Sequence, residues 1–317
     1  MTRRCAKKWL LIVLAFLSAV TVPAVRHTRR ESREAMAWKQ AAALGGSVQF
    51  DITPSTDALE STRQILRAAR GASPIPPERR LAWVTFRGGV FRERHARVCN
   101  DLDAGIVLIL NDVTLIDTTP LTVIPRLRQL LIRGVARQQL MGDFPILPSL
   151  HGIILDNVAI DAGALNRLTD LPELKQLMLA HCEIDDLYAV HFDRLHALRD
   201  LRIWLVNGQR LMLPPAVTES VALEFLELSG FELSSDCVAR IGRLPGVRTL
   251  GLASTVLPDN ALELLRDSSV THLTVDDGQF TPQQAADFER HTKGRVVEVI
   301  RPEPHRADIG AGRPERR

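Results

Sequence analysis

From Leu81 onward, the apolar residues follow a short phrase: an apolar residue, two variable ones, an apolar residue, one variable, and an apolar residue. The phrases begin at Leu81, Gly105, Leu127, Leu150, Leu174, Leu198, Leu223, Val247, Val270 and Gly294, with steps of 24, 22, 23, 24, 24, 25, 24, 23 and 24 residues. So regular a period predicts stacked copies of one supersecondary unit.

The unit that begins at Leu174 shows what each copy contains. Leu177 and Leu179 alternate with Gln176 and Met178, which predicts a short strand with one buried face. Asp185 then stands where a helix N-cap is expected. Apolar residues at roughly helical spacing follow at Leu187, Val190, Phe192 and Leu195.

Other units carry their own helix signals. Further N-cap candidates are Asp161, Ser234 and Asp259. Thr281 and Gln284 form a capping-box pattern with Pro282 at the first helical position. The unit from Leu198 is disturbed between residues 204 and 215, where Pro214 and Pro215 disfavour a regular helix.

One unit cannot bury its apolar face alone, so the copies must stack. Stacking makes a parallel sheet with strands about 4.8 Å apart and one continuous core. We therefore expect an α/β solenoid, a right-handed β-α superhelix with a parallel inner sheet and helices outside. The alternative is a doubly wound α/β domain, which also alternates strands and helices but has no fixed period.

These phrases resemble leucine-rich repeats over about two-thirds of the chain. Cys182 stands at the signature position of the cysteine-containing subclass, and Thr255 stands at the equivalent place in the unit of Val247. The resemblance is weaker in the unit at Gly105, where glycine replaces the first leucine, and in the unit at Leu198. It implies a leucine-rich-repeat solenoid that offers a binding surface.

The N-terminus carries an uncharged apolar run at residues 9–25, the short end of a transmembrane helix. A basic leader at residues 1–8 precedes it, which predicts a single-pass membrane protein with a cytoplasmic N-terminus and extracytoplasmic repeats. The alternative is a cleaved signal peptide, cut near Ala24. Basic residues beside the anchor favour anionic lipid headgroups.

The segment between anchor and repeats, residues 26–77, is expected to contain a juxtamembrane stalk at 30–43 and an N-terminal capping helix at 55–69. Residues 41–48 contain Ala-x-x-Leu-Gly-Gly-x-Val, and this layout resembles bacterial membrane-tethered leucine-rich-repeat proteins. The repeat domain is assigned to residues 78–300, with a last strand at 296–300. The tail at 301–317 is rich in Arg, Pro and Gly and is expected to be disordered.

Cysteine usage and net charge add little to the prediction of function. Cys182 and Cys237 lie two repeats apart, too far for a disulfide, and are expected to be buried. Cys99 has no obvious partner. The net charge is +3, and much of the excess comes from the leader and the tail, so nucleic-acid binding is not expected.

The residue between the two apolar strand positions faces the inner, concave side of the sheet. In successive units it is Thr85, Ile109, Leu131, Ile154, Met178, Arg202, Glu227, Gly251 and Thr274. An apolar run from Ile109 to Met178 is unusual on a solvent-facing sheet and predicts a docking surface for a protein partner. The predicted partner-binding residues are Ile109, Leu131, Ile154, Met178, Arg202, Trp204 and Glu227.

Two alternatives to a partner remain open for that surface. The segment before residue 80 would cover it, or two copies of the chain would pair there as a homo-oligomer. Trp204, which adjoins it, has an alternative place of its own in the core of the irregular unit.

Catalytic motifs are absent from the sequence. It contains no Gly-x-Ser-x-Gly, His-Glu-x-x-His, paired Cys-x-x-Cys or phosphate-binding glycine loop. The glycine pairs Gly45-Gly46 and Gly88-Gly89 and the Asp276-Asp277-Gly278 segment are interpreted as turns. The densest titratable group is His181, Glu183, Asp186, His191 and His196, which repeat geometry does not bring together. We expect no enzyme activity, no cofactor and no metal.

The expected function is a non-catalytic protein–protein interaction module presented at a membrane or cell envelope. The alternatives are a self-associating structural protein of the envelope, or an adaptor that presents substrate to a separate enzyme.

Overall fold

The computed structural model describes residues 32–50, 81–102, 104–134, 139–140, 144–205, 211–219, 222–290 and 296–300. The chain forms two compact units, residues 1–131 and 132–317. The boundary falls inside strand β4 (Leu127–Arg133).

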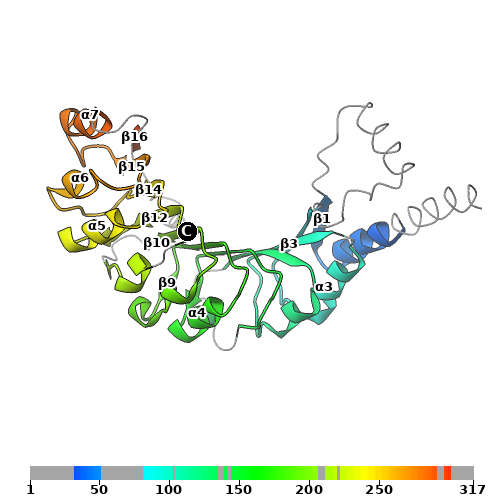
Figure 1. Ribbon diagram of the computed structural model, residues 1–317. Helices are drawn as coiled ribbons and strands as arrows, with labels where there is room; N and C mark the ends of the chain where they lie inside the picture. Colours follow the sequence, from blue (N-terminus) through cyan, green and yellow to red (C-terminus); the bar gives the residue numbers. More distant parts are fainter. Residues whose placement is uncertain are drawn as a thin grey trace, which may run out of the picture. The chain divides into compact units, whose positions relative to one another are not determined.

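The second unit is built on parallel strands that follow one another in chain order (Figure 1). They are β6 (Gly152–Asp156), β8 (Gln176–Ala180), β10 (Asp200–Trp204), β12 (Phe225–Ser229), β14 (Thr249–Gly251), β15 (His272–Asp276) and β16 (Val296–Ile300). A doubly wound domain reverses its strand order at a switch point. Since no reversal occurs here, that alternative is wrong, and the last strand lies where it was predicted.

The strand register aligns each repeat with the next. Leu177 pairs with Leu201, and Leu201 pairs with Leu226, so equivalent leucines lie beside one another. The residues at the start of the phrases are at most 1% exposed in four successive units, at Leu150, Leu174, Leu198 and Leu223. The repeated phrase therefore builds one core along the unit.

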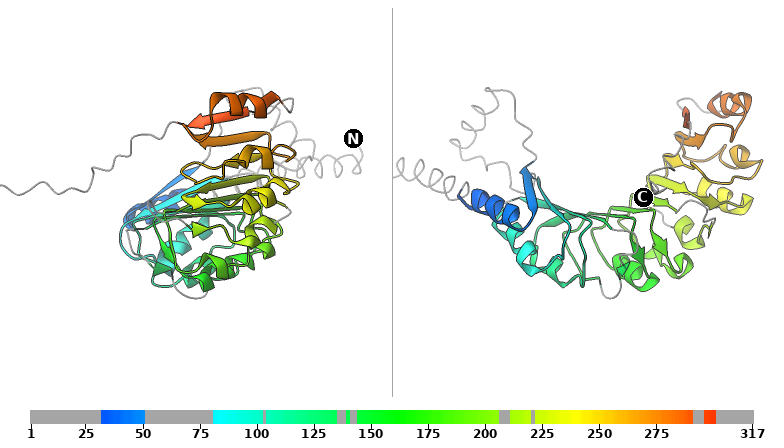
Figure 2. Two further views of the ribbon diagram at one scale, coloured as in Figure 1. Left: turned by 90° about the vertical axis from the view of Figure 1, so that its left-hand side faces the viewer. Right: turned by 180° about the vertical axis from the view of Figure 1, so that it is seen from behind.

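Helical segments lie on one side of these strands (Figures 1 and 2). The α-helices are α4 (Ala162–Thr169), α5 (Ser235–Gly242), α6 (Ala261–Leu264) and α7 (Pro282–Arg290). The 3-10 helices are η4 (Leu187–Ala189), η5 (Phe192–Arg194) and η6 (Pro215–Glu219). We call the opposite side of these strands the helix-free face, since no helix of the described residues covers it.

Short strands connect the main sheet to the helical side. One small sheet contains β5 (Gln139–Leu140), β7 (Ala159–Ile160) and β9 (Glu183–Ile184). The other pairs β11 (Leu211–Met212) with β13 (Phe231–Glu232). The repeats that contain these strands therefore have a second, short stretch of inter-repeat pairing after the main strand.

Three of the predicted helix starts are confirmed. The Asp161 side chain accepts the Ala164 N–H at 2.6 Å, and the Ser234 hydroxyl accepts the Cys237 N–H at 3.2 Å. Before α7, the Thr281 N–H donates to Gln284 Oε1 at 2.8 Å and the Gln284 N–H donates to Thr281 Oγ1 at 3.2 Å, which completes the capping box. These bonds satisfy N–H groups that a helix start leaves without a partner.

Two helix predictions are wrong in detail. The cap of η4 is Asp186, not Asp185, and Asn260 precedes α6 instead of Asp259, without a side-chain capping bond. The helix expected over residues 187–195 is split into η4 and η5, because Val190 is extended at φ −87° and ψ 126°. The irregular unit is confirmed, since its described helical segment is the 3-10 helix η6.

A buried side chain ties neighbouring repeats together just after the main strand. Cys182 Sγ donates to the Leu155 carbonyl at 3.4 Å, and Thr255 Oγ1 donates to the Leu228 carbonyl at 2.9 Å. Donor and acceptor are 27 residues apart in both cases. The predicted equivalence of Cys182 and Thr255 is therefore confirmed, because each side chain pairs a strand-end carbonyl of the preceding repeat.

The described cysteines are free and buried, as predicted for Cys182 and Cys237. Burial raises the pKa of Cys182 to about 11 and that of Cys99 to about 12. Both thiols therefore keep their protons at neutral pH and are poor nucleophiles.

The first unit contains a strand outside the repeat pattern. Strand β1 (Gly46–Phe50) runs antiparallel to β2 (Leu81–Arg87), and β2 is parallel to β3 (Gly105–Asn111). The helical segments of the first unit that follow β2 are α3 (Glu93–Val98), η2 (Cys99–Asp101) and η3 (Thr119–Val123). Strand β1 thus covers the free edge of β2, a role assigned from sequence to a helix at 55–69, which lies outside the described residues.

The predicted turn before β1 is confirmed. Gly45 has a φ of +74°, a left-handed conformation that favours glycine. Gly46 lies against the ring of Phe86, where a Cβ would come within 2.6 Å of the ring. The glycine pair therefore allows both the turn and the close approach of β1.

Residues 32–43 are helical, as expected for the stalk. Ala37 and Ala41, about one turn apart, are fully buried, so this helix packs against the protein instead of extending freely. Among the described residues, none of the helices has the length and apolar character to cross a membrane. The predicted anchor at 9–25 and tail at 301–317 lie outside the described residues, and the assigned domain limits stay predictions.

Replacing Thr255 by valine tests the inter-repeat bond. Thr255→Val keeps the shape but leaves the Leu228 carbonyl without its donor, so we expect the free energy of unfolding to fall by about 1–3 kcal/mol. Urea denaturation of the full chain measures it. Thr271→Val is the control, because Thr271 Oγ1 donates to the Arg248 carbonyl at 3.2 Å at an exposed position. Equal losses in the two variants would contradict a special role for Thr255.

Candidate functional site

The helix-free face of the second unit presents one row across neighbouring strands. Ile154 pairs with Met178, Met178 with Arg202, and Arg202 with Glu227. All four side chains are half-buried, and the residues on either side of each one in its strand are buried. The row is therefore apolar at one end and charged at the other.

The structure brings together five of the seven predicted partner-binding residues, since Ile154, Met178, Arg202, Trp204 and Glu227 all lie on this face. The other two, Ile109 and Leu131, belong to the first unit, where each is half-buried.

Trp204 shares the helix-free face with Asp200 and Arg202, because alternate residues of β10 point to the same side. It is half-buried there, so the alternative that places Trp204 in the core is wrong. Its indole N–H is buried and has no hydrogen-bond partner among the residues that the structure describes.

Arg202 is held rigidly on this face. Its Nε and Nη2 atoms donate to the Asp200 carboxylate at 3.0 and 3.1 Å, and Gln176 Nε2 donates to the same carboxylate at 3.1 Å. The guanidinium carbon lies 4.2 Å from the centre of the Phe225 ring, a cation–π contact. The hydrogen bonds to Asp200 raise the pKa of Arg202, so its charge is permanent.

Glu227 is less well satisfied. Its Oε2 atom lies 3.8 Å from Arg202 Nη1, and its side chain is 23% exposed. Burial raises its pKa, although the charge of Arg202 and the nearby indole of Trp204 act in the opposite direction. The indole N–H is close enough to act on this carboxylate, but its geometry falls short of a hydrogen bond.

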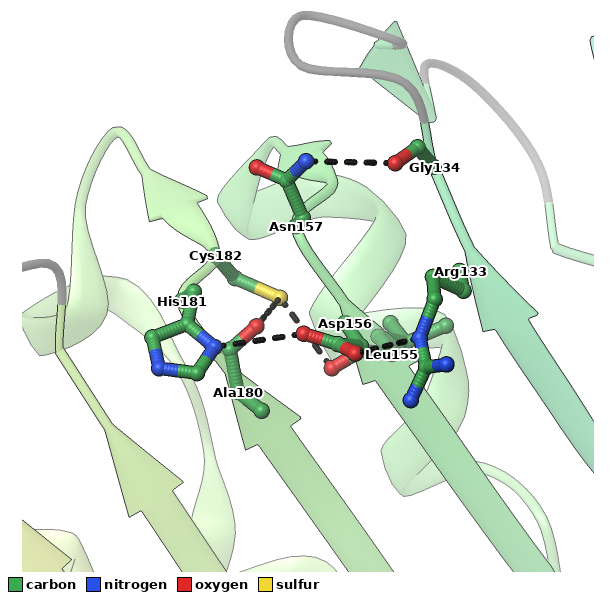
Figure 3. A network of polar contacts seen from close by, with 8 residues as sticks. All are labelled: Arg133, Gly134, Leu155, Asp156, Asn157, Ala180, His181 and Cys182. Atoms are coloured by element: carbon green, nitrogen blue, oxygen red, sulfur yellow. Dashed lines mark hydrogen bonds and ion pairs between the residues drawn. The ribbon is translucent and has the colours of Figure 1, made fainter. Parts of the chain in front are cut away.

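A second polar network crosses the ends of the neighbouring strands (Figure 3). Asp156 accepts Arg133 Nε at 2.7 Å through one oxygen and contacts His181 Nδ1 at 3.2 Å through the other. The His181 backbone has a φ of +53°, and its ring meets that of Trp204 edge-on at 6.2 Å. His181 therefore connects Asp156 to the aromatic side chain beside Glu227.

Another member of the predicted titratable group lies apart from this network. His191 lies on the helical side, where its N–H donates to Asn166 Oδ1 at 2.8 Å, away from His181. In the part of the chain that the structure describes, no group of three or more His, Cys, Asp or Glu residues is placed to hold a metal ion.

The aligned apolar phrase and the shared position of Cys182 and Thr255 define the fold of the second unit. Its repeats form a solenoid of the leucine-rich-repeat type. The resemblance of the chain to membrane-tethered leucine-rich-repeat proteins stays a prediction, because the residues of the apolar N-terminal run lie outside the described ranges.

Comparisons with known proteins report distant similarity to solved structures. No protein-family model and no curated protein matches the chain. An internalin C2 from Listeria monocytogenes shares 15% identity at a TM-score of 0.40, covering 69% of this chain and 80% of its own. An internalin (inlF) from the same organism shares 12% identity at a TM-score of 0.34, covering 69% of this chain and 82% of its own. A leucine-rich-repeat protein from Leptospira interrogans shares 15% identity at a TM-score of 0.29, covering 66% of this chain and 69% of its own.

Sequence reasoning missed three residues of the helix-free face. Asp200 and Phe225 hold Arg202, and Asp156 holds Arg133 and His181. Each of the three stands two positions along its strand from a residue of the row Ile154, Arg202 and Glu227, and therefore on the same side of the sheet. Reading every alternate strand residue, instead of one per repeat, would have found them.

The raised pKa of Glu227 predicts a pH-dependent cost. The folded state holds this proton more tightly than the unfolded state, whose pKa is near 4.5, so ionisation above that pH lowers stability. We expect Glu227→Gln to be more stable than the parent at pH 7, because the amide carries no charge that burial disfavours. The stability advantage of the Gln variant should vanish below pH 4.5, where the Glu227 carboxyl group of the parent is protonated and therefore uncharged, like the amide. Denaturant unfolding across pH measures it.

The exposed Glu232 provides the control for this measurement. Glu232→Gln makes the same chemical change at an exposed position, so we expect it to change the free energy of unfolding little. A Glu227→Gln variant that is less stable than the parent at pH 7 would contradict the assigned cost.

Proposed function

We propose that this leucine-rich-repeat protein is a non-catalytic protein-interaction module, presented at a membrane or cell envelope. The observation that carries the proposal is the row on the helix-free face, in which Ile154 and Met178 lie beside the fixed Arg202. Adjacent apolar side chains on a solvent-facing sheet favour docking. Tryptophan and arginine, here Trp204 and Arg202, are common interface anchors.

The rigidity of Arg202 supports the same conclusion. Ordering a long side chain at an interface costs about 0.5–1.5 kcal/mol. Asp200 and Phe225 already order Arg202 in the free protein, so much of that cost is met before a partner arrives. The face is thus preorganised for binding.

The absence of catalysis is also a proposal. The thiols of Cys99 and Cys182 are buried and protonated, so neither supplies a nucleophile. Arg202 and Asp156 are already paired with neighbouring side chains, an arrangement suited to recognition.

Crosslinking in intact cells tests the docking proposal. A photoactivatable amino acid at Met178 should capture specific adducts, while the same group at the exposed Glu263 on α6 should not. Ile154→Asp and Met178→Asp should each reduce capture by a crosslinker at Trp204 at least about tenfold, because a buried carboxylate opposes apolar contact. Thr274→Asp, farther along the same face, is the matched control.

Unchanged capture in folded Ile154→Asp and Met178→Asp variants would defeat the docking proposal. Light scattering of the full chain in mild detergent separates a foreign partner from self-association. A concentration-dependent dimer that Met178→Asp disperses would favour the structural, self-associating alternative.

Membrane presentation has its own test. If residues 9–25 are an uncleaved anchor, the chain should stay in the membrane fraction after a high-salt wash, because the hydrophobic effect is not screened by salt. N-terminal sequencing should recover the leader. A mature protein that begins near Val25 and is released by salt would show that the segment is a cleaved signal peptide.

A further inference from the structure

We propose that the helix-free face of the second unit binds a cationic segment of a partner protein. In this complex a lysine or arginine of the partner pairs with Glu227, and neighbouring apolar side chains of the partner pack on Met178 and Ile154. The inference rests on the proposed function and names the chemistry of the partner.

The charge of the face points to a cation. Its carboxylates are Asp156, Asp200, Glu227, Asp276 and Glu298, and its guanidinium groups are Arg133 and Arg202. With neutral histidines, the described face therefore carries three more negative than positive charges, although the whole chain carries a net charge of +3. A partner of complementary, positive charge would associate faster and more selectively.

Glu227 is the carboxylate that a cation would satisfy best. Asp200 already accepts Arg202 and Gln176, and Asp156 already contacts Arg133 and His181. Among the described residues, the ion pair of Glu227 is with Arg202 at 3.8 Å, which is longer than a hydrogen bond. A partner ammonium or guanidinium would supply a short, charge-assisted bond and offset the desolvation of the carboxylate.

The surroundings of Glu227 suit that role. The indole of Trp204 lies beside it, as its effect on the Glu227 pKa indicates. On the other side Glu227 extends across Gly251, where a Cβ would come within 2.7 Å of Glu227 Cγ. The missing side chain at Gly251 therefore allows the present position of the carboxylate.

The spacing of the row constrains the partner segment. Neighbouring strands lie about 4.8 Å apart, which places Met178 about 10 Å and Ile154 about 14 Å from Glu227 along the row. Side chains on one side of an extended peptide recur about every 7 Å. An extended segment with a cation, and with apolar residues two and four positions away, would span the row from Glu227 to Ile154.

Two matched peptides provide the probe. The first is Gly-Leu-Ser-Leu-Ser-Lys-Gly, and the second has Glu in place of Lys. Fluorescence anisotropy with the labelled peptides and the full chain in mild detergent should show at least about tenfold tighter binding of the Lys peptide, weakening as salt rises. Glu227→Gln should abolish the preference and Glu227→Arg should reverse it.

Two further variants make the test specific. Gly251→Ala should displace the Glu227 side chain and weaken binding of the Lys peptide, while the fold is kept because only a flexible side chain has to move. Glu232→Gln, on the exposed edge of β13, should leave both affinities unchanged.

Several results would overturn the inference. These are equal binding of the two peptides, no binding of either in the millimolar range, and a preference that survives Glu227→Gln. If crosslinking from Met178 still captures adducts in cells, the docking function stands and only the cationic partner is lost. Removal of residues 301–317 that tightens Lys-peptide binding would assign the face to the chain's own tail. A dimer dispersed by Glu227→Gln would assign it to a second copy.

Discussion

Parallel pairing of each strand with its counterpart one repeat away is the constraint on which the second unit depends. One repeat alone would leave Leu177 and Leu179 exposed on its strand. The hydrogen-bonded register places Leu201 and Ile203 of the next repeat beside them, so the core becomes continuous only as the repeats stack. The helical side is then free to vary. Pro214 and Pro215 replace an α-helix by a 3-10 turn, yet β10 and β12 keep their pairing.

The same register organises the opposite face. Since alternate residues of a strand point to opposite sides, Asp200, Arg202 and Trp204 are brought to the helix-free face by the pairing that buries Leu201 and Ile203. Polar contacts on that face then form between strands, as between Arg202 and Phe225 or Asp156 and Arg133. The core sets where these side chains stand but does not specify their chemistry. Glu227 illustrates the difference, because its ionised carboxylate is held there at a cost in stability.

The sequence was sufficient to predict features that recur with the period. The strands, the aligned leucines and the equivalence of Cys182 and Thr255 follow from position within the phrase. Features decided by single contacts were not predictable. The cap at Asp186 instead of Asp185 depends on the local hydrogen bonds of its carboxylate, and strand β1 lies outside the period altogether. The contacts that hold Arg202 were missed because Asp200 and Phe225 stand in a second row of the helix-free face. These contacts also depend on side-chain conformation.

The turn that follows the main strand also adopts a left-handed backbone in several repeats. Asp112, Asn157, His181 and Ser254 have φ values between 53° and 55°, and Gly88 and Gly230 have positive φ as well. One equivalent backbone position is thus occupied by side chains of different chemistry: a carboxylate, an amide, an imidazole and a hydroxyl, or by glycine. Asp, Asn, His and Gly are residue types that tolerate this conformation. Leu205, at the equivalent position of the irregular repeat, is not among the residues with positive φ. Substitutions among the tolerant types would change the polar chemistry of this rim without touching the leucine core.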